Sequence, residues 1–175
     1  MRIFAFSGKR GSGKTTICNH LRDCHGARDL SFAAPLRQEL AAIGYPEYIL
    51  NEKPTPDEIR ALLIAHGQAR RFIDPEYWIK KLFASIDMLP CLGRDPVVID
   101  DLRFWNEAEK LKNHKATLVR LERYGLQNAT PGVDDDDSET ELDDWHEWDY
   151  VVQAPDGGLS DLYSFANALV NGALR

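Results

Sequence analysis

The feature that most constrains this chain is a short apolar strand that runs straight into a phosphate-binding loop. Residues 2–7 read RIFAFS, and residues 8–15 read GKRGSGKT, a complete G-x-x-x-x-G-K-T motif. In this motif the glycines let backbone N–H groups face phosphate oxygens, the lysine reaches the β- and γ-phosphates, and the final hydroxyl ligates Mg²⁺. A helical pattern with Ile17 and Leu21 on one face follows, and a helix N-terminus favours an anion. The sequence therefore predicts a nucleoside triphosphate site. Its expected nucleotide contacts are Gly8, Gly11, Ser12, Gly13, Lys14, Thr15 and Thr16.

Length and composition indicate one ordinary globular domain. The chain has 175 residues, of which 43% are apolar, and it contains no apolar run of eighteen residues and no signal-peptide pattern. Its three cysteines include no C-x-x-C spacing, which favours reduced thiols. We therefore expect a cytoplasmic protein with no membrane partner.

The charge of the chain is unevenly distributed. The net charge is −7, but residues 133–149 carry ten acidic side chains and no Lys or Arg, which leaves the remainder at +3. A mildly basic body suits phosphate binding, and the absence of a dense Lys/Arg stripe argues against a nucleic-acid partner. Residues 123–147 are expected to form a flexible acidic loop, and the sequence leaves open whether this loop is a lid or solvent-exposed filler.

Apolar runs alternate with helical patterns along the chain. This alternation predicts an α/β fold with three layers, in which helices cover both faces of a mainly parallel sheet of about five strands. Residues 44–57 are rich in proline and read as a turn region. The expected strands are residues 2–7, 27–32, 96–100, 116–121 and 149–153. The expected helices follow the loop and recur near residues 33–40, 59–63, 77–86, 104–113 and 159–171.

Phosphoryl transfer needs in-line phosphates, Mg²⁺ and cations around the developing charge. Asp100 and Asp101 end an apolar strand, where an acidic side chain can hold Mg²⁺, and Arg103 follows them at the same edge of a parallel sheet. Arg120 and Arg123 flank the end of a later strand, so one of them could clamp the triphosphate. Three further arginines lie on the middle helices, and at least one is expected to face the cleft: Arg60, Arg70 and Arg71.

These motifs resemble those of the deoxynucleoside monophosphate kinases of tailed bacteriophages, a branch of the P-loop nucleotide kinases. The resemblance extends over nearly the whole chain. Its most specific segment is VIDDLRFWNEA at residues 98–108, an apolar strand followed by Asp-x-Arg-Phe and Asn-Glu. Similar segments are FAAPLR at 32–37, RALL at 60–63, RFIDPEYWI at 71–79 and WDYVV at 148–152.

The resemblance implies a fold, a reaction and residue roles. It implies a single P-loop kinase domain over residues 1–175, with residues 33–90 as its acceptor-binding helical part. The implied reaction transfers the γ-phosphoryl group of ATP to a deoxynucleoside monophosphate. Lys14 and Thr15 would hold ATP and Mg²⁺, Asp101 would support the metal, and Arg123 would be a lid arginine. Lys14, Arg71, Asp101, Arg103 and Arg123 are the implied catalytic set. The substrate contacts are assigned to Phe32, Arg37, Arg60, Arg71, Trp78, Asp101 and Arg103.

Two other functions remain open from the sequence. A P-loop kinase could phosphorylate a hydroxymethylated pyrimidine within DNA, although the chain lacks an evident basic face for a duplex. A regulatory protein could use ATP only as a switch, but it would have no need for Arg71, Asp101 and Arg103. The base preference, the choice between Asp100 and Asp101 at the metal, and the oligomeric state, including a homodimer, are not determined. If the protein is viral, its expected location is the host cytoplasm.

Overall fold

The computed structural model describes residues 1–52, 55–89, 95–123, 140–155 and 157–174. Their contacts divide the chain into two compact units, described separately below. Unit 1 comprises Met1–Leu30 and Cys91–Arg175, and unit 2 comprises Ser31–Pro90. The assignment of all 175 residues to one domain stays a prediction. Residues 124–139, which hold most of the expected acidic loop, lie outside the described residues.

Unit 1 is built on a five-stranded parallel sheet with the strand order β2-β3-β1-β4-β5. The central strand β1 is buried at all five positions, as expected for a parallel strand that is covered on both faces. The expected α/β fold with a five-stranded parallel sheet is confirmed. The strands are β1 (Ile3–Ser7), β2 (Arg28–Leu30), β3 (Val97–Ile99), β4 (Thr117–Arg123) and β5 (Tyr150–Ala154).

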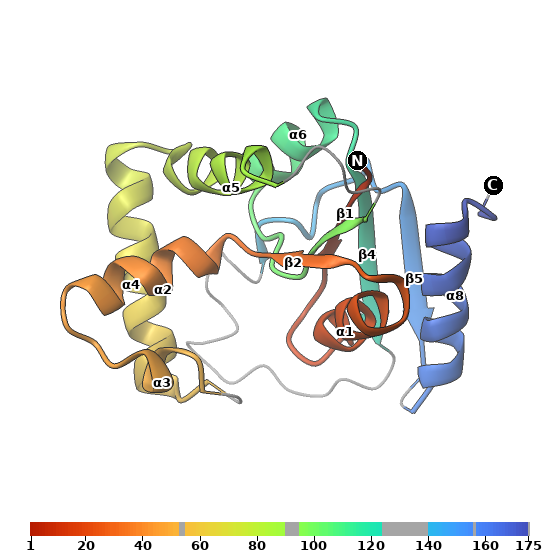
Figure 1. The fold of residues 1–175 in the computed structure, drawn as a ribbon, viewed down its shortest axis with the longest axis horizontal. Helices are drawn as coiled ribbons and strands as arrows, with labels where there is room; N and C mark the ends of the chain where they lie inside the picture. The colour runs from red at the N-terminus through yellow and green to blue at the C-terminus, as the bar shows by residue number, and fades with distance from the viewer. Residues whose placement is uncertain (53–54, 90–94, 124–139, 156, 175) are drawn as a thin grey trace. The chain divides into compact units, whose positions relative to one another are not determined.

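Helices cover both faces of this sheet (Figure 1). Helices α1 (Lys14–His25) and α8 (Leu159–Asn171) pack against each other and share one apolar core with the sheet. Helix α6 (Trp105–Asn113) packs against β4. The side chains of a strand alternate between the two faces, so Phe4 and Phe6 enter the core under α1 and α8. This packing fixes the loop between β1 and α1 at the carboxyl edge of the sheet.

Unit 2 is helical. Helix α2 (Ala33–Ala42) packs against the other three helices, α3 (Glu47–Leu50), α4 (Asp57–Ile73) and α5 (Tyr77–Asp87). The sequence predicted a turn region over residues 44–57. This prediction was wrong for Glu47–Leu50, which form the short helix α3. Pro46 supplies the fixed φ of a helix start, here −63°, and burial of Leu50 stabilises the short helix that follows.

Strand β4 runs two residues further than the apolar pattern predicts. Its partner β5 continues to Ala154, and Arg123 pairs with that residue across the ladder. The apolar pattern in the sequence ends at Leu121. The strand continues to Arg123 because its backbone still pairs with β5. The extension gives Arg123 a fixed backbone position at the carboxyl edge of the sheet.

Among the described residues, no helix has the length and apolar character needed to cross a bilayer.

Candidate nucleotide-binding site

The backbone of the loop between β1 and α1 has positive φ at its glycines, including the two glycines of the motif, Gly8 and Gly13. Gly8 has φ +146°, and a Cβ there would lie 2.3 Å from the carbonyl oxygen of Leu121. Gly13 has φ +99° and is the residue at which α1 begins. Side chains at these positions would fill the turn, so the motif glycines keep a cradle of backbone open for phosphate oxygens. The first N–H groups of α1 have no acceptor within the helix, which adds donors to this cradle.

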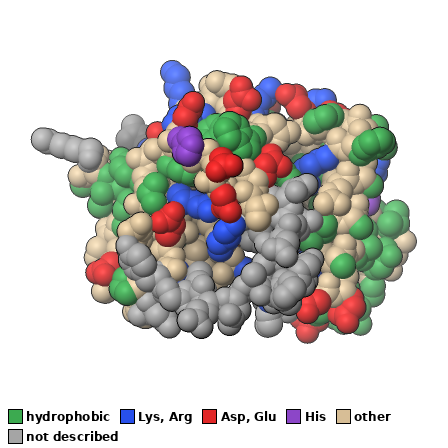
Figure 2. All heavy atoms as spheres, turned by 180° about the vertical axis from the view of Figure 1, so that it is seen from behind, with side chains coloured by type: hydrophobic (Ala, Val, Ile, Leu, Met, Phe, Trp, Pro, Cys, Tyr) green, Lys and Arg blue, Asp and Glu red, His purple; other side chains and the backbone are tan. Residues whose placement is uncertain are grey.

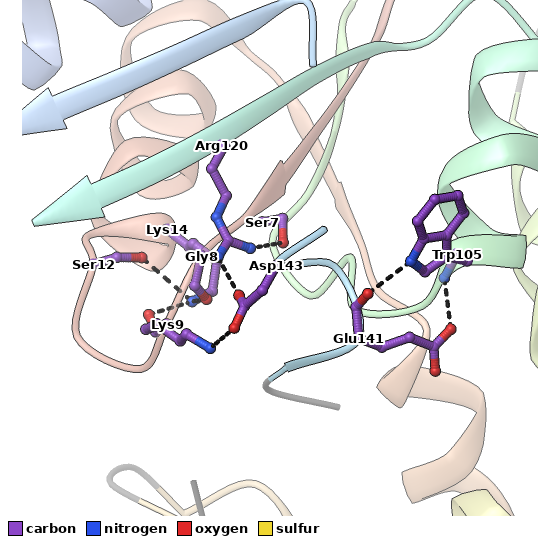
Figure 3. Close-up of polar contacts among 9 residues, drawn as sticks. All are labelled: Ser7, Gly8, Lys9, Ser12, Lys14, Trp105, Arg120, Glu141 and Asp143. Atoms are coloured by element: carbon purple, nitrogen blue, oxygen red, sulfur yellow. Dashed lines mark hydrogen bonds and ion pairs between the residues drawn. The ribbon is translucent and has the colours of Figure 1, made fainter. Parts of the chain in front are cut away.

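Lys14 lies across this loop and is only 8% exposed. Its ammonium donates hydrogen bonds to the carbonyl oxygens of Gly8 at 2.5 Å and Lys9 at 2.9 Å, and lies 3.5 Å from Ser12 Oγ (Figure 3). The positive charge is thereby held at the mouth of the cradle, at the place where the motif requires a cation for the transferred phosphate.

The hydroxyl of Thr15 donates a hydrogen bond to Asp100 Oδ2 at 3.1 Å. This contact joins the first turn of α1 to the end of β3, because β1 and β3 are adjacent parallel strands. A hydroxyl beside a carboxylate is a donor set that suits Mg²⁺, which keeps several waters and needs few protein ligands. The sequence favoured Asp101 for this role. Asp101 is half-buried one residue further on, so its assignment to the metal stays a prediction beside the contact that Asp100 makes.

No group of three or more His, Cys, Asp or Glu side chains within the described part of the chain is arranged to hold a metal ion. This finding concerns protein-only metal cages. The Thr15 and Asp100 oxygens fit the other kind of site, in which water and phosphate oxygens supply most of the ligands.

Further cations surround the loop. Arg120 pairs in register with Ser7, the last residue before the loop, and its guanidinium lies 3.4 Å from the Ser7 hydroxyl. Arg123 donates a hydrogen bond from Nη1 to the carbonyl oxygen of Gly11 at 3.0 Å. Arg123 thus lies beside the phosphate-binding loop. Its role as a lid arginine stays a prediction.

Asp143 lies between two of these cations. Its Oδ2 accepts a hydrogen bond from Lys9 Nζ at 2.6 Å, and its Oδ1 accepts one from Arg120 Nη2 at 2.6 Å (Figure 3). Partial burial pushes the pKa of Asp143 upward, but the hydrogen bonds from Lys9 and Arg120 outweigh it and hold the pKa below the ordinary range. Asp143 is therefore a firmly ionised carboxylate beside the loop.

The segment that carries Asp143 is tied to the start of α6. The backbone N–H of Trp105 donates to Glu141 Oε1 at 2.9 Å, and its indole Nε1 donates to the carbonyl oxygen of Glu141 at 2.7 Å (Figure 3). Trp105 and Trp145 meet edge to face, and Trp145 is buried. The buried Trp145 ring thus anchors this segment to unit 1.

Arg103 lies two residues before the start of α6, beyond the end of β3. Its backbone N–H and that of Phe104 donate to the buried carboxylate of Glu107 at 3.1 Å and 3.2 Å. These bonds cap the start of α6 and set the backbone from which the half-buried Arg103 side chain extends. The structure thus gives Arg103 a fixed base in unit 1, while its contact with an acceptor stays a prediction.

The remaining predicted acceptor residues lie in unit 2. Arg37 donates from Nε to the carbonyl oxygen of Leu50 at 3.1 Å. Trp78 is 1% exposed, and its Nε1 donates to the carbonyl oxygen of Gly67 at 3.1 Å. Packing of α5 against α4 accounts for the burial of Trp78, and its assignment as a substrate contact stays a prediction. Phe32 is buried, and Arg60 and Arg71 are half-buried, and their assignments also stay predictions.

Glu39 on α2 is the centre of a hydrogen-bond and ion-pair cluster in unit 2 that the sequence analysis did not predict. The carboxylate accepts hydrogen bonds from His66 Nε2 at 3.1 Å, Arg70 Nε at 3.0 Å and the Tyr77 hydroxyl, and Lys81 Nζ lies 3.8 Å away. Burial raises the pKa of Glu39, but the hydrogen bonds of Tyr77 and His66 and the charge of Arg70 outweigh it and lower the pKa. The partners are spread over α4 and α5, so no local spacing could have revealed them.

Two other residues at the loop also escaped the sequence analysis. Lys9 occupies an unspecified position of the loop motif, and Asp143 is one of ten acids within residues 133–149.

On the face drawn in Figure 2, described Lys and Arg side chains are interspersed with Asp and Glu and form no continuous basic stripe. The expectation that nucleic acid is not a partner stays a prediction.

The known proteins to which the chain is similar include two viral proteins and a kinase of known structure. The chain is 33% identical over 147 residues to "Uncharacterized protein ORF76" of Ictalurid herpesvirus 1 (strain Auburn), over 83% of its own length and 58% of the relative's. It is 29% identical over 198 residues to "Putative deoxynucleotide monophosphate kinase" of Acanthamoeba polyphaga mimivirus, over 99% of its own length and 98% of the relative's. The chain thus spans well under two-thirds of the herpesvirus protein. No family model matches the sequence.

The structural neighbour is the crystal structure of a sugar kinase from Janibacter sp. HTCC2649. It aligns with a TM-score of 0.50 over 98% of this chain and 95% of the neighbour, at 14% sequence identity. At this identity the similarity concerns the fold alone. The parallel sheet, the glycine loop with Lys14 and Thr15, and this neighbour together show that the chain has the P-loop kinase fold.

Proposed function

We propose that this protein is an ATP-dependent kinase that phosphorylates a nucleoside monophosphate, with a deoxynucleoside monophosphate as the preferred class. The observation that carries the proposal is the geometry at the loop, where Lys14 faces the cradle and Thr15 contacts Asp100. The kinase fold and the mimivirus relative, which matches along almost its whole length, support a phosphotransferase. The name of that relative supports the acceptor class.

The donor side of the reaction falls to unit 1. The loop N–H groups and Lys14 bind and orient the phosphate chain, and Thr15 and Asp100 would hold Mg²⁺. The metal, when bound, neutralises charge on the phosphate oxygens. Arg120 and Arg123 add positive charge at the same edge of the sheet, where charge develops during transfer.

On the acceptor side, Arg103 is our candidate in unit 1 for the phosphate of the monophosphate, and Arg71 is a separate candidate in unit 2. Arg103 is supported by its fixed position at the start of α6, close in sequence to Asp100 and Asp101. Arg71 is supported by its place in the segment that resembles the phage enzymes. Guanidinium groups bind phosphate oxygens in bidentate geometry, which also orients the acceptor for in-line attack.

The test is a coupled ADP-release assay across the four common dNMPs, the corresponding NMPs and a duplex DNA with hydroxymethylated pyrimidines. We expect turnover with at least one dNMP, and Arg103→Ala should lower kcat/KM for it by about tenfold to a hundredfold, because a charged hydrogen bond is lost. ATP binding should survive this substitution.

Arg28→Ala is the matched control. Arg28 begins β2, so it lies at the amino-terminal ends of the strands, away from the loop, and it pairs with Asp95. Turnover of DNA alone would transfer the proposal to a base within DNA. ATP binding without any acceptor turnover would favour a nucleotide-dependent switch. A homodimer, a cytoplasmic location and a phage origin stay predictions.

A further inference from the structure

One carboxylate bridges two cations beside the phosphate-binding loop. Lys9 contributes its ammonium from within the loop, and Arg120 contributes its guanidinium from β4, in register with Ser7. Each oxygen of Asp143 accepts one hydrogen bond, at 2.6 Å in both cases (Figure 3). Two oxygens of a phosphate group can accept the same two charge-assisted bonds.

The positions of the two cations, Lys9 and Arg120, do not depend equally on their contacts with Asp143. The Arg120 side chain is 12% exposed, lies 3.4 Å from the Ser7 hydroxyl and stacks at 5.8 Å over the ring of Trp148. Its position is therefore fixed by groups other than Asp143. The Lys9 and Asp143 side chains are 45% and 42% exposed, and ion pairs this accessible contribute little net stability. An incoming phosphate, with more charge than a carboxylate, can exchange with Asp143.

The surrounding segment allows this exchange without unfolding. Leu142 and Trp145 flank Asp143 and are buried, and Glu141 is bound to Trp105. The backbone is thus anchored on both sides. Rotation of the exposed Asp143 side chain towards solvent breaks its hydrogen bonds to Lys9 and Arg120.

We propose that Lys9 and Arg120 form a phosphate subsite beside the loop, and that Asp143 is a built-in counter-ion which a phosphate of the bound nucleotide displaces. This inference rests on the proposed function insofar as the loop binds a nucleoside triphosphate. Its consequence is that Asp143 weakens phosphate binding, because breaking its two contacts opposes association. The low pKa of Asp143 keeps the competitor charged at neutral pH.

The experiment is isothermal titration of the full chain with MgATP and, separately, with inorganic tripolyphosphate. Asp143→Asn removes the competing charge with little change of shape, and we expect the Kd for both ligands to fall by about threefold to tenfold. Asp144→Asn, at an exposed neighbour, makes the same change in net charge and should leave Kd within about twofold.

A double-mutant cycle tests whether Lys9 is a cation for which Asp143 and the phosphate compete. Lys9→Met should raise Kd for tripolyphosphate, and adding Asp143→Asn to it should shift Kd by less than about twofold, because the competitor has lost one of its two partners. Asp143→Ser provides a second neutral variant if the amide misfolds, and the melting temperature of each variant checks its fold.

A higher or unchanged Kd in both neutral variants at Asp143 would overturn the inference and indicate that Asp143 positions the cations for the ligand. The outcome is separable from that of the proposed function. An effect at Asp143 without turnover of any monophosphate removes the kinase assignment alone, whereas turnover without an effect at Asp143 removes the subsite alone. No binding of MgATP to any variant contradicts both.

Discussion

The two units each place one carboxylate among several basic side chains, but they enclose it differently. In unit 1, Asp143 bridges Lys9 and Arg120 and is 42% exposed. In unit 2, Glu39 receives His66, Arg70 and Tyr77, and its side chain is 18% exposed. The first carboxylate is itself open to solvent, and the second is largely enclosed among partners supplied by the two helices packed against its own.

This difference in enclosure separates a binding cluster from a structural one. An exposed carboxylate forms weak ion pairs that can be exchanged, whereas removal of a largely buried carboxylate leaves its several donors without their acceptor. We therefore expect substitutions in the unit 1 cluster to change ligand affinity and turnover, and substitutions at Glu39 to change stability. Three predictions test this contrast.

The largest effect is expected from Lys14→Ala. The substitution removes the cation that is hydrogen-bonded to the loop carbonyls and should lower kcat by about a thousandfold, since the proposed donor site assigns this cation to the transferred phosphate. The measurement is single-turnover ADP formation with the best monophosphate, with the melting temperature as a control for folding. Near-normal turnover would contradict the assignment of the loop as the donor site.

The next effect distinguishes two neighbouring carboxylates. Asp100→Asn should raise the Mg²⁺ concentration required for half-maximal activity by about tenfold to a hundredfold, because Asp100 contacts the Thr15 hydroxyl. Asp101→Asn is the matched control and should have the smaller effect. A reversed order would restore Asp101, the residue favoured by the sequence, to the metal site.

The smallest effect concerns stability and tests the contrast itself. Glu39→Gln should lower the free energy of unfolding by about 1–3 kcal/mol, because several donors lose a charged acceptor. Asp143→Asn should change it by less than about 1 kcal/mol. Urea unfolding of both variants and the unsubstituted protein measures the difference, and equal losses would remove the distinction between the clusters.

The pH dependence of unfolding gives the same test its sign. The pKa of Glu39 is lower in the folded protein than in the unfolded chain, so the unfolded state binds more protons between the two values. The stabilisation is complete above the unfolded pKa and is lost as pH falls through the folded pKa. In Glu39→Gln this part of the acid-side slope should disappear.

Much of the fold follows from local patterns in the sequence. The apolar runs and helical spacings predicted every strand of the described sheet and the helices that cover it, because an apolar run or a helical spacing is a property of each element alone. The pattern failed at α3, where one proline and one buried leucine stabilise a single turn, and at the end of β4, where pairing with β5 decides the length.

The candidate site divides in the same way. The sequence by itself determined the phosphate-binding loop, because Gly8, Gly13, Lys14 and Thr15 perform their roles through backbone geometry and spacing within eight residues. Only the tertiary structure decided that Thr15 meets Asp100 and that Asp143 meets Lys9 and Arg120. These partners lie 85, 134 and 23 residues apart. Their meeting depends on strand order and register, which no local pattern encodes.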